Sequence, residues 1–256
     1  MEHHVHHKVK RSNKVLALLQ ANAIPVSIII AGVLIGAAVV LKNRIGGIAQ
    51  GTDTTAPLAQ DGSQPSGPTK PANIDEIKIA GNPFIGKENA PVVVAYWYDY
   101  QCPFCKQVET NVFPKLLSEY VNTGKVKLVF KGYPVLGQDS YSAALAERGV
   151  WSAYPDKFFK WHEQMFAKQD EENGGWGNRQ DILEIAKSLG MNTDDLDKLI
   201  VANASQNQQN LQADLDEGQA YGVTGTPSFM IGKKLIVGSV PYNQVKAAIE
   251  AVLKSK

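Results

Sequence analysis

The chain has 256 residues, a net charge of +1 and only two cysteines. Residues 1–72 carry seven Lys and Arg and three Asp and Glu, a net charge of +4, which leaves −3 for residues 73–256. A folded part with this charge is not expected to bind nucleic acid, and two cysteines exclude a disulfide-rich scaffold.

The first predicted element is a membrane anchor at residues 24–41, which are uncharged and almost entirely apolar. As a helix this run spans ~27 Å, close to the hydrocarbon thickness of a bilayer. Four Lys and Arg lie between residues 8 and 14, against two just after the run, a bias that places residues 1–23 in the cytoplasm. A cleaved signal peptide is the alternative, but the run exceeds the usual apolar core and no Ala-x-Ala site directly follows it.

Residues 42–73 are rich in Gly, Thr, Ser, Pro, Ala and Gln and contain few large apolar side chains. Such a segment cannot bury enough surface to fold, and we expect a flexible linker. It would tether a folded domain at residues 74–256 to a single-pass anchor in the cell membrane. The orientation of the anchor places that domain outside the cytoplasm.

Both cysteines stand in the run Cys102-Pro103-Phe104-Cys105, between a strand-like segment at residues 92–98 and a helix-like one. A helix N-terminus stabilises a thiolate, because unpaired N–H groups point at the sulfur. We therefore predict Cys102 as the nucleophile and Cys105 as the resolving thiol. Pro103 suits the first helical turn, where its missing N–H costs nothing.

The cysteine pair has two other interpretations. A zinc site needs four ligands, and His162 is the only histidine outside the first seven residues, so we expect no metal site. A purely structural disulfide would close so short a loop that it would stabilise the fold little. Thiol–disulfide chemistry is the favoured interpretation. No dinucleotide or flavin motif is present, and we expect no bound cofactor.

The remaining elements follow from hydrophobic spacing. Apolar residues recur every four positions from Phe104 to Tyr120, which predicts a helix with one buried stripe. A strand is predicted at residues 126–130, and a helical block over about 139–221. Strands are then predicted at 228–231 and 235–237, joined by a hairpin turn, with a last amphipathic helix after them.

This order of elements, with CPFC opening the first helix, resembles the α/β thioredoxin fold with an inserted all-helical subdomain, as in the DsbA family. Three stretches carry the resemblance, at residues 90–105, 158–166 and 222–229. The tethered layout is similar to that of membrane-anchored DsbA-like proteins of the BdbD type.

The resemblance implies roles for further residues. Pro227 would follow a cis peptide bond and face the cysteines, and the backbone of Thr226 would bind an extended substrate. Phe104 replaces a histidine of DsbA and cannot donate to the Cys102 thiolate, which weakens the pair as an oxidant. The position of Asp99, three residues before Cys102 at the end of the strand, makes it a candidate to relay the proton of Cys105. A solvated side chain at the strand end is the alternative.

We expect structural roles for two other residues. His162, on the predicted helix at 158–166, stands where the family often has a polar side chain, and we do not expect a general base there. Lys131, at the end of the strand at 126–130, could pair with a buried carboxylate or reach solvent, and we expect it to reach solvent.

The resemblance therefore implies an extracytoplasmic thiol–disulfide oxidoreductase that donates the Cys102–Cys105 disulfide to reduced or unfolded secreted proteins. A DsbB-like or quinone-linked membrane protein would reoxidise it. A reductase or isomerase of the same fold is the nearest alternative. A non-catalytic tethered module that binds unfolded chains is an alternative of a different class.

Overall fold

The computed structural model describes residues 68–172 and 174–256. Its centre is a five-stranded sheet in the order β1-β3-β2-β4-β5, in which β2 and β3 are parallel and the other neighbours antiparallel. The strands are β1 (Phe84–Ile85), β2 (Val92–Tyr98), β3 (Val126–Gly132), β4 (Ser228–Ile231) and β5 (Lys234–Val237).

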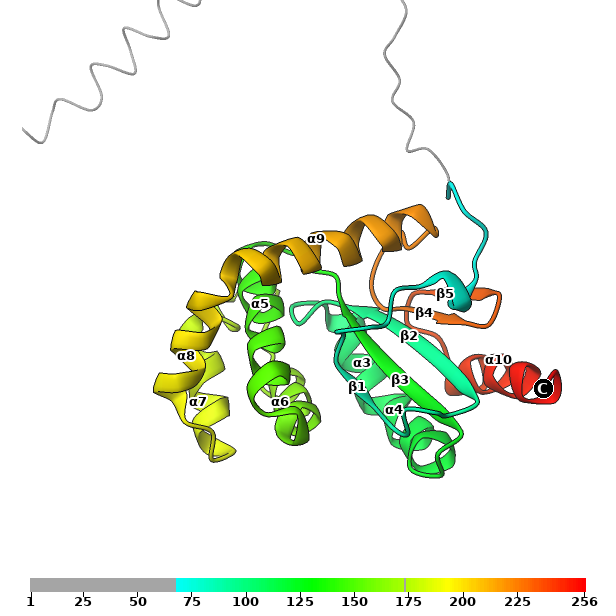
Figure 1. Cartoon of the computed structure of the whole chain (residues 1–256), viewed down its shortest axis with the longest axis horizontal. Helices are drawn as coiled ribbons and strands as arrows, with labels where there is room; N and C mark the ends of the chain where they lie inside the picture. The colour runs from blue at the N-terminus through cyan, green and yellow to red at the C-terminus, as the bar shows by residue number, and fades with distance from the viewer. Residues whose placement is uncertain (1–67, 173) are drawn as a thin grey trace, which may run out of the picture. The chain divides into compact units, whose positions relative to one another are not determined.

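The helices fall into two groups. Those of the sheet domain are η1 (Ile74–Glu76), α3 (Pro103–Asn111), α4 (Phe113–Leu116), the π-helical turn η2 (Leu117–Val121) and α10 (Tyr242–Lys254). Between β3 and β4 come α5 (Gln138–Ala153), α6 (Pro155–Ala167), α7 (Arg179–Ser188), α8 (Thr193–Ala202) and α9 (Ala204–Ala220). Figure 1 shows α5 to α8 gathered beside the sheet, with α9 running back from them toward β4. The predicted strand–helix–strand unit, helical insertion, hairpin and last helix are confirmed.

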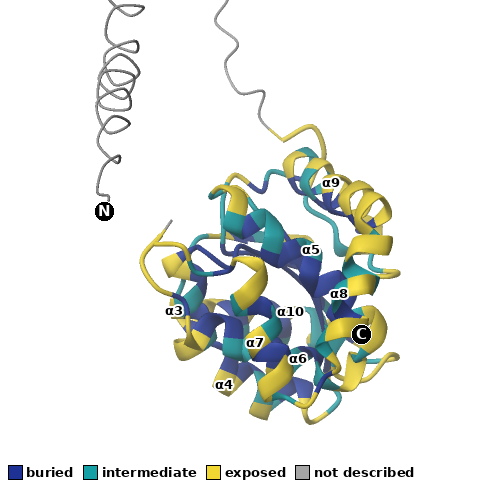
Figure 2. Ribbon diagram, turned by 90° about the vertical axis from the view of Figure 1, so that its left-hand side faces the viewer, coloured by how far each residue is buried: buried dark blue, intermediate teal, exposed yellow. Residues whose placement is uncertain are grey.

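Strand β2 separates two hydrophobic layers, because alternate side chains of a strand point to opposite faces. Val94, Tyr96 and Tyr98 join the larger cluster, which also contains Cys102 and Cys105. Ala95 and Trp97 join a smaller cluster on the other face. The seven residues of β2 include only one that is not buried, and Figure 2 shows this buried centre beneath the more exposed outer surfaces of the helices. The cysteines therefore belong to the core layer that α3, α6 and α10 cover.

The predicted single helix after the cysteines is wrong in two respects. It is divided at Val112, because Pro114 has no N–H to donate to the carbonyl one turn earlier. Its first apolar residue, Phe104, does not belong to the buried stripe: 54% of it is exposed, whereas Val108 is fully buried. The strand predicted at 126–130 also continues to Gly132.

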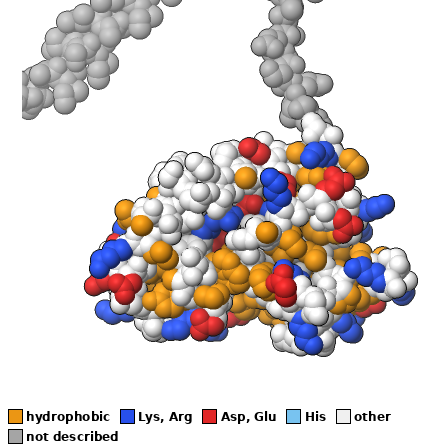
Figure 3. Space-filling view, viewed as in Figure 1, with side chains coloured by type: hydrophobic (Ala, Val, Ile, Leu, Met, Phe, Trp, Pro, Cys, Tyr) orange, Lys and Arg blue, Asp and Glu red, His pale blue; other side chains and the backbone are white. Residues whose placement is uncertain are grey.

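The N-terminal predictions fall on residues that the structure does not describe: the cytoplasmic tail, the anchor at 24–41 and most of the linker. Across residues 68–172 and 174–256, no helix is both long enough and apolar enough to cross a bilayer. The backbone N–H of Lys70 donates to the Ala220 carbonyl at 3.0 Å, so the described chain begins against the end of α9. On the face drawn in Figure 3, Lys and Arg are interspersed with Asp and Glu, and hydrophobic side chains lie between them.

Candidate active site

The two cysteines lie at the start of α3, as the sequence predicts. Cys102 is the N-cap residue, Pro103 opens the helix, and both sulfurs are free thiols. The carbonyl of Cys102 accepts hydrogen bonds from the N–H groups of Cys105 and Lys106 at 3.1 and 3.2 Å. Cys102 is 4% exposed and Cys105 is not exposed at all. An incoming thiol therefore meets Cys102 first.

The surroundings divide the two thiols into one acidic and one non-acidic group. A hydrogen bond from the Cys105 thiol lowers the pKa of Cys102 to about 6, against the opposing effect of burial. The Thr226 side chain and the backbone N–H groups of Cys105 and Phe104 add to the lowering. Burial raises the pKa of Cys105 well above its ordinary value, and the neighbouring Cys102 raises it further. At neutral pH the reduced pair is thus a Cys102 thiolate beside a Cys105 thiol.

The loop before β4 lies against Cys102. The bond between Thr226 and Pro227 is cis, as predicted, and the Cys102 Sγ donates to the Thr226 carbonyl at 3.4 Å when it is protonated. Phe104 projects into solvent from the turn between the cysteines, and Val135 is exposed to a similar extent. The exposed Phe104 ring, two residues from the reactive Cys102 sulfur, suits contact with an unfolded chain.

Asp99 is buried in the loop that leads from β2 to α3. Its carboxylate accepts from the N–H groups of Gln101, Val135 and Leu136 at 2.9, 2.8 and 3.1 Å, and from the Ser140 hydroxyl at 2.6 Å. Its backbone N–H lies beside the Cys105 thiol. The side chain therefore ties the cysteine loop to the segment that follows β3, while its proposed role as a proton relay stays a prediction.

A second carboxylate, Glu109, is partly buried and was not predicted from the sequence. Its Oε1 lies 3.1 Å from Nε2 of His162, and Nδ1 of His162 lies 3.0 Å from the Tyr100 hydroxyl. His162 is fully buried among aromatic rings, including those of Tyr98 and Phe130. The sequence held a signal for Glu109: it is four residues after Cys105, so the two share one face of the helix.

The expectation that Lys131 reaches solvent is wrong. Its Nζ is fully buried and lies 2.6 Å from Asp214 Oδ1 and 2.8 Å from Glu217 Oε2. It also donates to the Lys78 carbonyl at 2.7 Å. Lys131 is in register with Trp97 of β2, so this charge cluster lies on the face of the sheet opposite the cysteines.

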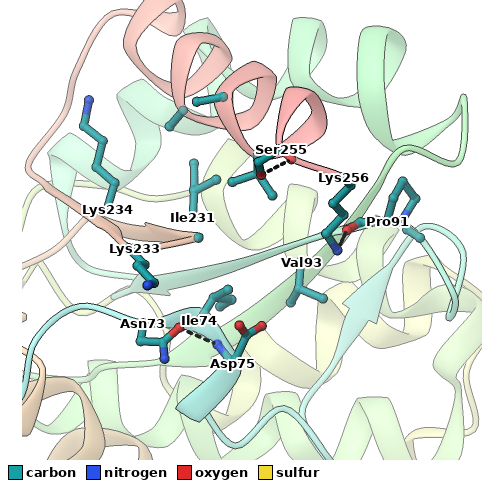
Figure 4. Close-up of a pocket in the computed structure, with 15 residues that line it drawn as sticks. Asn73, Ile74, Asp75, Pro91, Val93, Ile231, Lys233, Lys234, Ser255 and Lys256 are labelled. Carbon is teal, nitrogen blue, oxygen red and sulfur yellow. Dashed lines mark hydrogen bonds between the residues drawn. The ribbon is translucent and has the colours of Figure 1, made fainter.

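A pocket of about 550 Å³ lies at the other end of β2. Figure 4 shows its residues, which include Val93, Ile231 and three lysines, Lys233, Lys234 and Lys256. Because Val93 is near the start of β2 and Cys102 follows its end, this pocket is not part of the thiol site. No group of three or more His, Cys, Asp and Glu within the described residues could hold a metal ion.

A family model described as thioredoxin matches residues 78–251. Disulfide bond formation protein D of Bacillus subtilis is 33% identical over 183 residues, which cover 70% of this chain and 80% of that protein. The chain belongs to the DsbA-like thiol–disulfide oxidoreductases of the thioredoxin family. Thiol–disulfide exchange is therefore its enzymatic activity.

Solved structures agree with this assignment of the DsbA-like fold. Oxidised BdbD from Bacillus subtilis has a TM-score of 0.65 and 30% identity, covering 73% of this chain and 98% of that one. The thiol-disulfide exchange protein alpha-DsbA2 of Wolbachia pipientis has a TM-score of 0.59 and 28% identity, covering 68% and 88%. In this DsbA-like chain the exchange site has Phe104 between its cysteines.

Proposed function

We propose that the protein introduces disulfides into secreted or surface proteins, by exchange through Cys102 and Cys105 on the extracytoplasmic side of the membrane. The name of the Bacillus subtilis relative, disulfide bond formation protein D, supports this direction. The substrates are reduced or unfolded chains. Residues 24–41 anchor the protein, and a DsbB-like or quinone-linked membrane protein reoxidises it.

The lowered pKa of Cys102 is the observation that carries the proposal. A substrate thiolate attacks Cys102 Sγ, the Cys102–Cys105 bond breaks, and a mixed disulfide forms. The second substrate thiolate then attacks the substrate sulfur, and Cys102 leaves as a thiolate. A thiol with a pKa of about 6 leaves readily. Its ionisation also raises the reduction potential of the cysteine pair at pH 7, by at most about 30 mV, which favours the reduced enzyme.

The substrate is held by the residues around Cys102. An extended segment would bind the backbone of Thr226 beside Pro227, with an apolar side chain against the exposed ring of Phe104. These contacts depend little on the sequence of the substrate, because main-chain hydrogen bonds and apolar contacts are common to unfolded chains. We therefore expect the protein to accept many different substrates.

Single-turnover oxidation of a reduced dithiol peptide tests the proposal. The oxidised full-length protein is mixed with the peptide, and acid quenching with thiol alkylation follows both partners. We expect the peptide disulfide to form as the enzyme thiols appear. Cys105→Ser, first loaded as a mixed disulfide with glutathione, separates attack at Cys102 from the resolving step, and Cys102→Ser should not react.

Two results would contradict the proposal. A Cys102→Ser variant that oxidises the peptide normally would eliminate exchange at this pair. An oxidised wild-type protein that leaves the peptide reduced, while its own reduced form cleaves peptide disulfides, would favour the reductase.

A further inference from the structure

The pocket at the start of β2 takes no part in the exchange chemistry, yet it is an open hollow with an apolar wall. It has a volume of about 550 Å³ and lies between α10 and η1, with Val93, Ile231 and Val252 in its lining. Val93 is the one residue of β2 that is not buried. A ligand from solvent therefore reaches apolar side chains at this end of the sheet.

The rim of the pocket is positively charged. Lys233, Lys234 and Lys256 line it together with a single carboxylate, that of Asp75, and all four residues are exposed. Among residues 68–172 and 174–256, none of these three lysines forms an ion pair. Lys256 donates to the Pro91 carbonyl on one side of the pocket, and Lys233 and Lys234 lie on the other (Figure 4). Ammonium groups without an acidic partner suit an anion such as a phosphate.

The predicted linker joins the folded domain at this pocket. Asn73, its last residue, belongs to the lining. The backbone N–H of Ile74 donates to the Gly232 carbonyl at 2.8 Å, which fixes the end of the linker to the turn between β4 and β5. Lys233 follows Gly232 in that turn, and Lys234 opens β5. The lysines of the rim therefore lie where the tether enters the domain.

The tether has a length that suits contact with a membrane. Residues 42–67 separate the predicted anchor at 24–41 from the first described residue. As a flexible chain they span ~30 Å. An anionic bilayer attracts lysines within about one Debye length of its surface, ~8–10 Å. The tether is thus long enough for the lysines to reach the lipid head groups and short enough to keep them nearby.

We propose that this pocket docks the domain on the membrane by binding the phosphate head groups of anionic phospholipids. Lys233, Lys234 and Lys256 would supply the charge, and the apolar wall would pack against the glycerol part of the lipid. The inference rests on the membrane anchor of the proposed function and adds a second, reversible contact to it. Because the contact is electrostatic, it weakens as salt is added.

Docking at this pocket leaves the exchange site free. The pocket includes Val93 near the start of β2, whereas Cys102 follows the end of the strand. A strand of seven residues is ~20 Å long. Lipid bound at the pocket therefore does not cover Cys102, and substrates can reach the sulfur while the domain is docked.

Amine footprinting of the full-length protein in lipid nanodiscs tests the docking. A neutral acylating reagent is applied in phosphatidylglycerol and in phosphatidylcholine nanodiscs, and mass spectrometry gives the rate at which each lysine is modified. We expect Lys233 and Lys234 to react at least about threefold more slowly in phosphatidylglycerol, because lipid binds their ammonium groups. Lys187 on α7 and Lys198 on α8 are exposed controls in the same sample and should change by less than about 1.5-fold.

A double variant with a matched control sharpens this test. Lys233→Glu with Lys234→Glu should abolish the slower modification of Lys256 in phosphatidylglycerol, because two repulsive charges replace two attractive ones. Lys187→Glu with Lys198→Glu alters the net charge equally, on helices of the insertion, and should retain it. The comparison separates docking through the pocket from a general effect of charge.

Asp75→Asn tests the sign of the effect. It removes the one Asp or Glu of the lining, so the protection of Lys233 and Lys234 in phosphatidylglycerol should increase by about twofold. Added salt should reduce that protection. Soluble glycerol phosphate, added to the phosphatidylcholine sample, should not reproduce it, because docking needs a charged membrane surface.

The docking is overturned if Lys233 and Lys234 react equally in both lipids, if Lys187 and Lys198 are protected to the same extent, or if soluble glycerol phosphate alone protects the pocket. Thermal unfolding shows whether each variant is folded, and the wild-type footprint and Asp75→Asn remain tests if a double variant is not. A protein that fails to co-purify with either nanodisc would refute the proposed anchor and the docking with it. Failure of the docking alone leaves the protein in the nanodisc, so the two failures are distinct.

Discussion

Asp99 and Glu109 are a buried and a partly buried carboxylate that flank the cysteine pair in sequence, yet their surroundings differ. Asp99 accepts four hydrogen bonds, three from backbone N–H groups. Glu109 contacts one histidine and lies beside one tyrosine hydroxyl. Burial raises the pKa of both, but four donors fix the Asp99 carboxylate in place, whereas Glu109 has a single contact with His162. One region holds the active-site loop, and the other joins α3 to α6.

Asp99→Asn should have the largest effect on stability and so separates the two regions. The amide offers one acceptor and turns a donor toward N–H groups, which leaves buried donors unpaired. We expect a loss of about 2–4 kcal/mol in the free energy of unfolding, measured with urea. Glu109→Gln keeps its contact with His162 and should lose less than about 1 kcal/mol.

Asp216→Asn serves as the control for Asp99→Asn. Asp216 is exposed on α9 and accepts from Gln212 four residues earlier, so its change should stay within about 0.5 kcal/mol. Equal losses for Asp99→Asn and Glu109→Gln would remove the distinction between the two regions.

The pH dependence of stability separates Cys102 from both carboxylates. The folded pKa of Cys102 is about 6, against about 8.5 for an unfolded thiol. Between these values the unfolded chain binds more protons, so the reduced protein gains stability as the pH rises, by roughly 1–3 kcal/mol. The raised pKa values of Asp99 and Glu109 act in the opposite direction, since their contributions fall as the pH rises from the ordinary carboxyl range through the folded pKa.

Urea unfolding of the reduced protein at several pH values between 6 and 8.5 measures this gain. Cys102→Ser should show no such rise, because it has no thiol to ionise at that position. If the stability of Cys102→Ser rose with pH by the same amount, the effect would belong to another group. That result would contradict the presence of a thiolate at Cys102.

Phe104→His should have the smallest effect. The side chain at this position is exposed between the cysteines, and a histidine there can donate to the Cys102 thiolate without touching either carboxylate. Each unit by which it lowers the pKa of Cys102 should raise the reduction potential by up to about 30 mV, measured by equilibration with glutathione. Phe104→Leu keeps an apolar side chain and should leave the potential unchanged. An equal shift in both variants would rule out the hydrogen bond as the cause.

The sequence predicted the parts of the site that are local. The CPFC run, its place at a helix start and the order of strands and helices depend on short-range spacing, and the cis bond before Pro227 followed from the family resemblance. The pairing of Glu109 with His162 joins two helices across 53 residues, and no spacing rule brings such residues together. The burial of Lys131 likewise depends on carboxylates from α9, more than 80 residues later. Phe104 is 54% exposed although Cys105, the next residue, is fully buried, a difference that the four-residue spacing of apolar side chains does not show.

The equilibrium reduction potential of the Cys102–Cys105 pair tests the central claim, that this protein donates disulfides, most directly. The full-length protein is equilibrated with glutathione buffers, and alkylation of the thiols gives the fraction reduced. The account predicts a potential more positive than about −200 mV, on the oxidising side of the glutaredoxins. A more negative value, toward the roughly −270 mV of thioredoxin, would contradict net oxidation and favour a reductase.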